Sequence, residues 1–212
     1  MIMLSLSIFC SSQSLSVAIY NEKKLEKFFE KKILDGRIEG IFSIIRECLK
    51  KYSLRKIKYI ICNNGPGSFT GMRSLKSICQ ALALSSGAKI YSSSTFIPYL
   101  TFYINKSVNV LVIFKFSGSK FFFRKFEILN KQISSKSDIL VDEVSGIKNF
   151  YFKEKEKFKQ LSVITDNKSI SDLFRSEDVK LYNANAKDLT QSFLGGYCDK
   201  DFKIFYHNTY YE

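Results

Sequence analysis

The fold of this 212-residue chain is decided by one stretch, Asn63-Asn64-Gly65-Pro66-Gly67-Ser68-Phe69-Thr70-Gly71-Met72-Arg73. It follows a β-branched run at 57–62, which predicts a strand, and it precedes a segment from Gly71 to Ser86 that predicts a helix. Gly87 ends this helix as a C-terminal glycine does. Glycine permits positive φ, proline stiffens the turn, and the hydroxyl of Thr70 or Ser68 can cap the helix. The sequence therefore predicts a glycine-rich loop between a strand and a helix.

Taken by its residues alone, the loop has two interpretations. Free N–H groups at a helix N-terminus bind phosphate, so a nucleotide site is one of them. However, the stretch matches neither G-x-G-x-x-G nor G-x-x-x-x-G-K-[ST], and no lysine follows at the required place. A structural turn is favoured and the phosphate site stays open. Ser68 is a poor candidate for a hydrolytic nucleophile, because no histidine lies near it in the sequence.

The residues before the loop predict the start of an α/β lobe. Strands are expected at 2–9 and 14–20, with a third at 25–30, as in an antiparallel meander. An apolar stripe at helical spacing predicts a helix over about 37–52. The stripe consists of Ile38, Ile41, Phe42, Ile45, Leu49 and Tyr52. A strand at 88–92 and a short helix or turn at 94–104 complete a predicted N-terminal lobe at 1–105.

The second half of the chain repeats this pattern. Strands predicted at 108–116 and 120–128 are joined by a Ser-Gly-Ser turn, which echoes the first hairpin and indicates a duplicated fold. A strand at 161–165 and a helix near 186–198 follow. The alternating Lys and Glu of 153–159 predict a solvated surface segment. The expected C-terminal lobe is therefore 106–212.

Composition excludes several kinds of chemistry. The only histidine is His207, which argues against histidine triads and two-histidine metal sites. The five cysteines form no C-x-x-C pair, so we predict no metal site and a reduced, cytoplasmic protein. No apolar run approaches the roughly 20 residues that span a bilayer, so no membrane association is predicted. Net charge +13 suggests nucleic acid, but only six of the 33 cations are arginine, so compositional drift is favoured over a selected binding surface.

The string NNGPGSFTGMRSLKSICQALALSSGAKIYSSST closely resembles the signature of the TsaB (YeaZ) family. That family's loop reads G-P-G-S-F-T-G-[LM]-R, and this chain matches it throughout. The matching residues are Gly65, Pro66, Gly67, Ser68, Phe69, Thr70, Gly71, Met72 and Arg73. A weaker likeness extends over the whole chain. The resemblance implies the actin/Hsp70/hexokinase-like (ASKHA) fold, an α/β class with two lobes that each contain a β-meander sheet and helices.

The resemblance also implies a function. TsaB-like proteins are non-catalytic subunits needed to make threonylcarbamoyladenosine (t6A) at adenosine-37 of tRNA, where they stabilise or activate the catalytic subunit TsaD. A TsaE-like ATPase belongs to the same pathway, and tRNA is contacted through the complex. Pairing with TsaD uses the two N-lobe helices, matched here by 37–52 and 71–86. The expected interface residues are Ile38, Ile41, Phe42, Ile45, Leu49, Met72, Leu75, Cys79 and Leu82.

This sequence departs from the family at two places where acidic residues are usual. Phe9 stands where the first strand usually carries aspartate, and Phe114-Lys115-Phe116 stands where the second lobe carries Asp-Ala-Arg. No catalytic residue and no cofactor are therefore predicted. An independent nucleotide-binding, ATPase-like enzyme of the same superfold is the alternative, and direct tRNA binding by lysines is a third hypothesis. The sequence leaves open whether the chain forms a homodimer when alone.

Overall fold

The computed structural model describes residues 3–32, 41–158, 160–174 and 179–205. The chain folds as two compact units. The first unit comprises Met1–Pro98 and Asn185–Glu212, and the second comprises Tyr99–Ala184. The predicted boundary at residue 105 differs from this division in one important way. The chain after Ala184 returns to the first unit, because Phe202 is buried in the same apolar core as the first strands.

The first unit is built on a five-stranded sheet in the order β3-β2-β1-β4-β5. Its strands are β1 (Leu4–Cys10), β2 (Ser14–Asn21), β3 (Lys24–Lys32), β4 (Ile57–Asn63) and β5 (Lys89–Ser93). The first three strands form the expected antiparallel meander, whereas β4 pairs in parallel with β1 and β5 in parallel with β4. All five strands agree in position with those that the sequence predicts.

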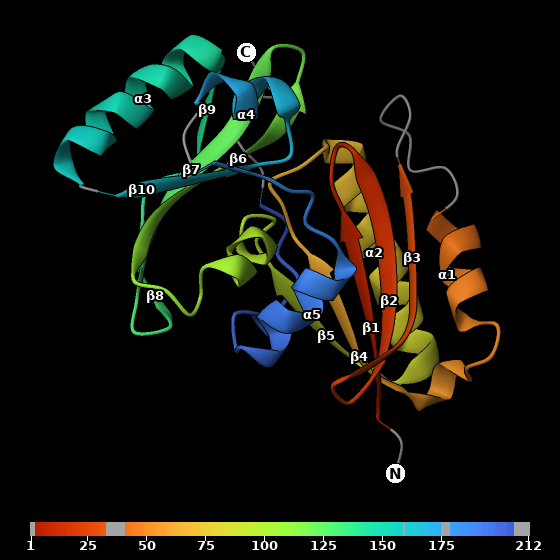
Figure 1. Cartoon of the computed structure of the whole chain (residues 1–212). Coiled ribbons are helices and arrows are strands. Elements are labelled where there is room, and N and C mark those ends of the chain that lie inside the picture. Colours follow the sequence, from red (N-terminus) through yellow and green to blue (C-terminus); the bar gives the residue numbers. More distant parts are fainter. Residues whose placement is uncertain (1–2, 33–40, 159, 175–178, 206–212) are drawn as a thin grey trace. The chain divides into compact units, whose positions relative to one another are not determined.

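Helices cover both faces of this sheet (Figure 1). One face packs against α1 (Ile41–Leu49) and α2 (Phe69–Ser86), and the other against α5 (Ala186–Leu194). Side chains alternate along β1 accordingly, since Leu6 joins the core under α1 and α2 while the Ser7 hydroxyl bonds that of Thr190 in α5 at 2.7 Å. A short 3-10 helix, η1 (Leu54–Lys56), precedes β4.

Two predicted helices differ in length from the observed ones. The described part of the helix expected over 37–52 runs only from Ile41 to Leu49, and Tyr52 lies in a turn whose N–H donates to the Leu49 carbonyl. Ile38 lies outside the described residues, as does His207. The last helix ends at Leu194 rather than 198, because Gly195 and Gly196 follow it and Gly196 has a positive φ of 81°.

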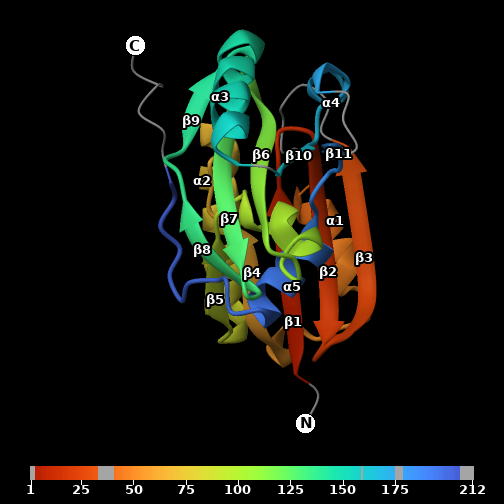
Figure 2. The same cartoon turned by 60° about the vertical axis from the view of Figure 1, so that its left-hand side comes forward.

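The second unit repeats the topology of the first. Its sheet has the order β11-β10-β6-β7-β8, with a sixth strand, β9, beside β7. These strands are β6 (Val108–Ser117), β7 (Lys120–Leu129), β8 (Gln132–Lys136), β9 (Leu140–Asp142), β10 (Leu161–Thr165) and β11 (Val179–Leu181). Figure 2 shows β6, β7 and β8 running alongside one another. Three antiparallel strands followed by two parallel ones thus occur in both units, which confirms the predicted duplicated α/β fold.

Three helical segments complete the second unit. Helices α3 (Val144–Lys157) and α4 (Lys168–Leu173) pack on one face of the sheet through Ile147, Tyr151 and Ile170. The 3-10 helix η2 (Ile97–Phe102) leads into the unit. The predicted solvated segment at 153–159 includes the last turns of α3, where Lys153, Lys155, Glu156 and Lys157 are exposed as expected, but the prediction is wrong for Glu154. Glu154 is buried there, and it forms ion pairs with Lys125 and Lys157.

Candidate functional site

The glycine-rich loop is held by hydrogen bonds within the first unit. The Asn64 N–H donates to the Ser93 carbonyl at 2.9 Å, and the Thr95 N–H donates to the Gly65 carbonyl at 2.8 Å. Ser68 is the N-cap of α2, and its hydroxyl accepts from the Gly71 N–H at 3.2 Å. Of the two predicted caps, the structure therefore selects Ser68. The helix begins at Phe69, two residues before the expected start.

The C-terminal segment crowds the loop at Gly65. The Phe205 N–H donates to the Asn64 carbonyl at 2.8 Å. Gly65 has a φ of +107°, and a Cβ atom built on it would lie 2.8 Å from the Phe205 carbonyl oxygen. Gly67 in turn packs against the Met72 side chain, and the Arg73 guanidinium lies 3.8 Å from the centre of the Phe69 ring. The glycines thus serve close packing of the chain against itself, which favours the structural-turn interpretation over a phosphate cradle.

The predicted interface residues divide into buried and exposed ones. Five of them are core side chains of the first unit with at most 3% exposure. These are Ile41, Ile45, Met72, Leu75 and Cys79. They face the sheet, so their apolar stripe reflects the packing of α1 and α2 on the strands, and the expectation of direct partner contact is wrong for them. Leu49 and Leu82 are partly buried against the same core, while Phe42 is 67% exposed.

Apolar side chains do remain at the surface of these helices. Besides Phe42, Leu84 of α2 is 88% exposed, and Ala81 is exposed one turn before it. No charged residue occurs between Ser77 and Ala88. The exposed residues of this part of α2 are thus uncharged, with apolar Ala81 and Leu84 beside polar Gln80 and Ser85, and the absence of charge is typical of the centre of a protein interface. The predicted interface residues did not include Leu84, although its position opposite Leu75 and Cys79 on the helical wheel was a usable signal.

Phe9 and Phe114, which stand where the family usually has acidic residues, are both buried. Phe9 is fully buried in β1. Phe114 in β6 is 3% exposed, and its ring stacks on Tyr99 with 5.7 Å between ring centroids. Neither side chain can ligate a metal or accept a proton. Among the described residues, no group of three or more His, Cys, Asp and Glu side chains is placed to hold a metal ion.

Asp166 is a buried carboxylate that the sequence reading did not single out. It follows β10, and its Oδ1 accepts a hydrogen bond from the Lys115 N–H at 3.2 Å. Burial raises the pKa of this carboxyl to about 7, against the lowering effect of hydrogen bonds from backbone N–H groups and Tyr99. The signal in the sequence was its place directly after a β-branched strand. The Lys115 bond links the end of β10 to β6.

Comparison with known proteins gives a sequence match and a structural match. No family model matches the chain. Over 92 residues it is 35% identical to "tRNA threonylcarbamoyladenosine biosynthesis protein TsaB" of Buchnera aphidicola subsp. Acyrthosiphon pisum (strain APS). It is 34% identical to TsaB of Buchnera aphidicola subsp. Schizaphis graminum (strain Sg) over the same length. Each match covers 42% of this chain and 41% or 43% of the relative, so less than half of either TsaB protein is matched.

The structural match extends over nearly the whole chain. YeaZ from Pseudomonas aeruginosa superposes with a TM-score of 0.66 at 14% identity, covering 97% of this chain and 99% of that one. A second structure, described as a protein with similarity to peptidase YEAZ from Pseudomonas aeruginosa, gives a TM-score of 0.65 at 13% identity, covering 97% and 98%. At these identities the likeness establishes the fold.

The duplicated sheet topology and the superposition on YeaZ show that this chain has the YeaZ fold, which is the two-unit α/β fold predicted from the sequence. The sequence match over 92 residues is to two proteins of one family. The resemblance to the TsaB (YeaZ) family is confirmed. No helix among the described residues is long and apolar enough to cross a membrane.

Proposed function

We propose that this chain is a non-catalytic subunit in t6A synthesis on tRNA, and that it acts by binding a TsaD-like catalytic subunit. The observation that carries the proposal is the 35% identity over 92 residues to a protein named for threonylcarbamoyladenosine biosynthesis, joined to a YeaZ fold over 97% of the chain. A TsaE-like ATPase is expected in the same assembly, with tRNA contacted through the complex. Such a subunit works in the cytoplasm, where tRNA is modified.

Three structural observations support an accessory role over an enzymatic one. The glycine-rich loop is packed against Phe205, and Phe9 and Phe114 are buried where the family usually has acidic residues. Catalytic groups need access to substrate and suitable acids or bases, and these positions supply neither. The alternative, an ATPase-like enzyme with phosphate bound at Gly65–Gly71, has no such support from the geometry.

We assign partner binding to the outer surface of α1 and α2, here called the outer helix surface and defined by Phe42, Ala81 and Leu84. The two helices lie on the same face of the first sheet, and each carries apolar residues that point away from the core. Burying a fully exposed leucine or phenylalanine contributes about 1.5–3 kcal/mol, so Phe42 and Leu84 can supply much of the binding free energy. The buried residues of the stripe act indirectly by fixing the two helices on the sheet.

Reconstituted tRNA modification tests this function. Threonylcarbamoyl-adenylate that is labelled in its threonine moiety is incubated with tRNA, TsaD and the TsaE-like ATPase, with and without this chain, and the label transferred to tRNA is measured. We expect incorporation to depend on the chain, and we expect the chain alone with Mg²⁺ and ATP to release no phosphate. Incorporation that is the same without the chain would contradict the accessory role, whereas steady phosphate release by the chain alone would favour the enzyme.

A further inference from the structure

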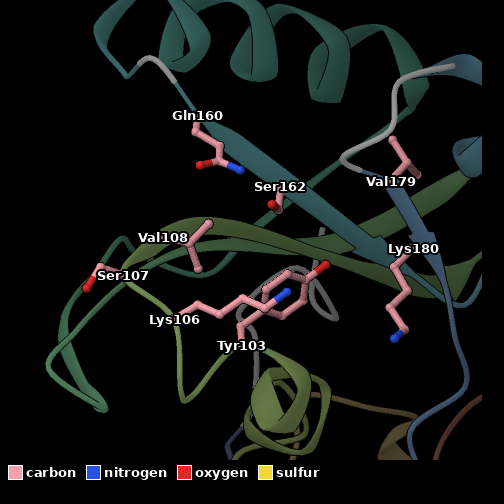
Figure 3. A pocket seen from close by; sticks show the side chains of 8 residues that line it. All are labelled: Tyr103, Lys106, Ser107, Val108, Gln160, Ser162, Val179 and Lys180. Atoms are coloured by element: carbon pink, nitrogen blue, oxygen red, sulfur yellow. The ribbon is translucent and has the colours of Figure 1, made fainter.

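The second unit contains a cavity of about 440 Å³ at the edge where its parallel strands begin. Figure 3 shows side chains from the start of β6, β10 and β11 and from the segment after η2 converging on it. The polar groups that line the cavity are Tyr103, Lys106, Ser107, Gln160, Ser162 and Lys180. Tyr103 and Ser162 are 7% and 5% exposed, so these two side chains form a floor rather than an open surface.

The charge of the cavity is positive. Lys106 and Lys180 both line it, and none of the described lining residues is Asp or Glu. Within the described parts of the chain, neither lysine forms an ion pair with a carboxylate. Glu127 lines an adjoining cavity of about 250 Å³, where it accepts a hydrogen bond from Ser135. Among the described residues, therefore, no carboxylate neutralises the two ammonium charges.

Aromatic rings hold both ammonium groups in place. Lys180 Nζ lies 3.4 Å from the centre of the Phe102 ring, and Lys106 Nζ lies 5.7 Å from that of Tyr103. Cation–π contacts of this kind stabilise a lysine by about 0.5–1 kcal/mol at exposed sites. They restrict the side chains without neutralising them, so binding an anion here costs less conformational entropy than binding it with free surface lysines.

We propose that this cavity binds a small phosphate-bearing molecule of mononucleotide size, with its phosphate held by Lys106 and Lys180. Two cations with hydroxyl and amide donors suit a dianion that has several acceptor oxygens better than they suit a single carboxylate. Ser107, Ser162 and Gln160 supply those donors. The cavity lies within the roughly 300–1,000 Å³ that small-molecule sites occupy, near the lower end.

The same phosphate chemistry could be supplied by RNA, and the shape of the site argues against it. An RNA strand is followed by a groove that tracks many phosphates and needs cations spread along it. This cavity instead concentrates its two lysines over a buried serine and tyrosine. A single terminal phosphate group fits that arrangement.

Nuclear magnetic resonance titration of the isotope-labelled full chain tests the proposal, with AMP, inorganic phosphate and a short oligoribonucleotide without terminal phosphates as separate probes. We expect millimolar AMP to shift the amide signals of 103–108, 160–162 and 179–180. Lys106→Glu and Lys180→Glu should each weaken AMP binding about tenfold or more, because each removes a charge-assisted hydrogen bond and adds repulsion. Ser107→Phe, at an exposed position on the rim, should block AMP without changing the charge.

Lys153→Glu is the matched control, since Lys153 is exposed on α3 and its replacement changes the net charge equally. It should leave AMP affinity within about twofold. Equal weakening by Lys153→Glu, shifts scattered over the lysines of both units, or tighter binding of the oligoribonucleotide than of AMP to the same amides would overturn the proposal. So would the absence of shifts with AMP and phosphate. None of these results would alter the proposed role in t6A synthesis.

Discussion

At the residue scale, Asn63 shows how one buried side chain organises the glycine-rich loop. Its amide oxygen accepts from the Cys10 N–H at 2.9 Å, and its nitrogen donates to the Cys10 carbonyl and the Thr95 hydroxyl. It therefore links the ends of β1 and β4 to the segment after β5. A fully buried polar group is stable only with such partners, which is why the loop begins at a fixed position.

The two hydroxyls at the start of α2 give a first prediction. Ser68→Ala removes the hydrogen bond that caps the helix, so we expect the free energy of unfolding to fall by about 1 kcal/mol. Thr70→Ala, within the first turn, is the control and should cost much less. The measurement is urea denaturation of both variants. Equal losses would show that Ser68 does not act as the cap.

The buried carboxyl of Asp166 gives a prediction about pH. Because burial raises its pKa to about 7 from 3.8, the folded chain binds a proton that the unfolded chain releases between these values. Its contribution to stability is therefore fully present below about pH 4 and is lost as the pH rises through about 7. Asp166→Asn keeps an oxygen for the Lys115 N–H but cannot ionise. We expect the variant to gain stability over the natural chain between pH 4 and 7, by a few kcal/mol at neutral pH, when denaturation is measured across that range. A constant difference between the two proteins would contradict the assignment.

At the element scale, the contact between the loop and the C-terminal segment rests on Gly65. Gly65→Ala places a Cβ against the Phe205 carbonyl at a positive φ, and we expect it to cost about 2–3 kcal/mol. Gly87→Ala is the matched control, because Gly87 also has a positive φ of 71° but has open space around it, so only about 1 kcal/mol should be lost.

Hydrogen exchange distinguishes the loss of the contact with Phe205 in Gly65→Ala from the backbone strain alone in Gly87→Ala. The Phe205 amide is bonded to the Asn64 carbonyl, so Gly65→Ala should speed its exchange while Gly87→Ala should not. Unchanged protection of Phe205 in Gly65→Ala would show that the segment does not depend on this glycine.

The elements also show what local sequence determines. The Gly87 stop and the β-branched run of β4 are local signals that the sequence predicted, whereas for the cap it offered Ser68 and Thr70 without deciding between them. Helix α3 was missed because only Ile147, Tyr151 and Glu154 of its side chains are buried, which gives a weak apolar period. Strand β11 has only three residues, and β8 is mostly exposed, so neither gives a clear strand pattern. Strands β8 and β11 are stabilised by pairing with β7 and β10, and α3 is stabilised by packing on the sheet.

At the scale of the whole molecule, the repeated strand order could be anticipated from two similar hairpins, but the path of the chain after Ala184 could not. That return to the first unit depends on tertiary packing of α5 on β1 and of Phe202 in the core, which no local pattern reports. The predicted partner interface on α1 and α2 also depends on tertiary packing that no local pattern reports. An apolar stripe predicts a buried helix face, yet it does not say whether the sheet or a partner covers it, and here the sheet covers Met72, Leu75 and Cys79.

The central claim is that the outer helix surface binds TsaD, and the affinity of the two purified proteins tests it most directly. Titration calorimetry is carried out with the natural chain, with Phe42→Glu and Leu84→Glu, and with Phe152→Glu as the control. Phe152 lies on α3 in the second unit and is 57% exposed, close to the 67% of Phe42. We expect Phe42→Glu and Leu84→Glu each to weaken binding at least about tenfold, because each places a charge in an apolar interface, and Phe152→Glu to bind as the natural chain does. No measurable binding by the natural chain, or binding unchanged in both variants, would contradict the claim.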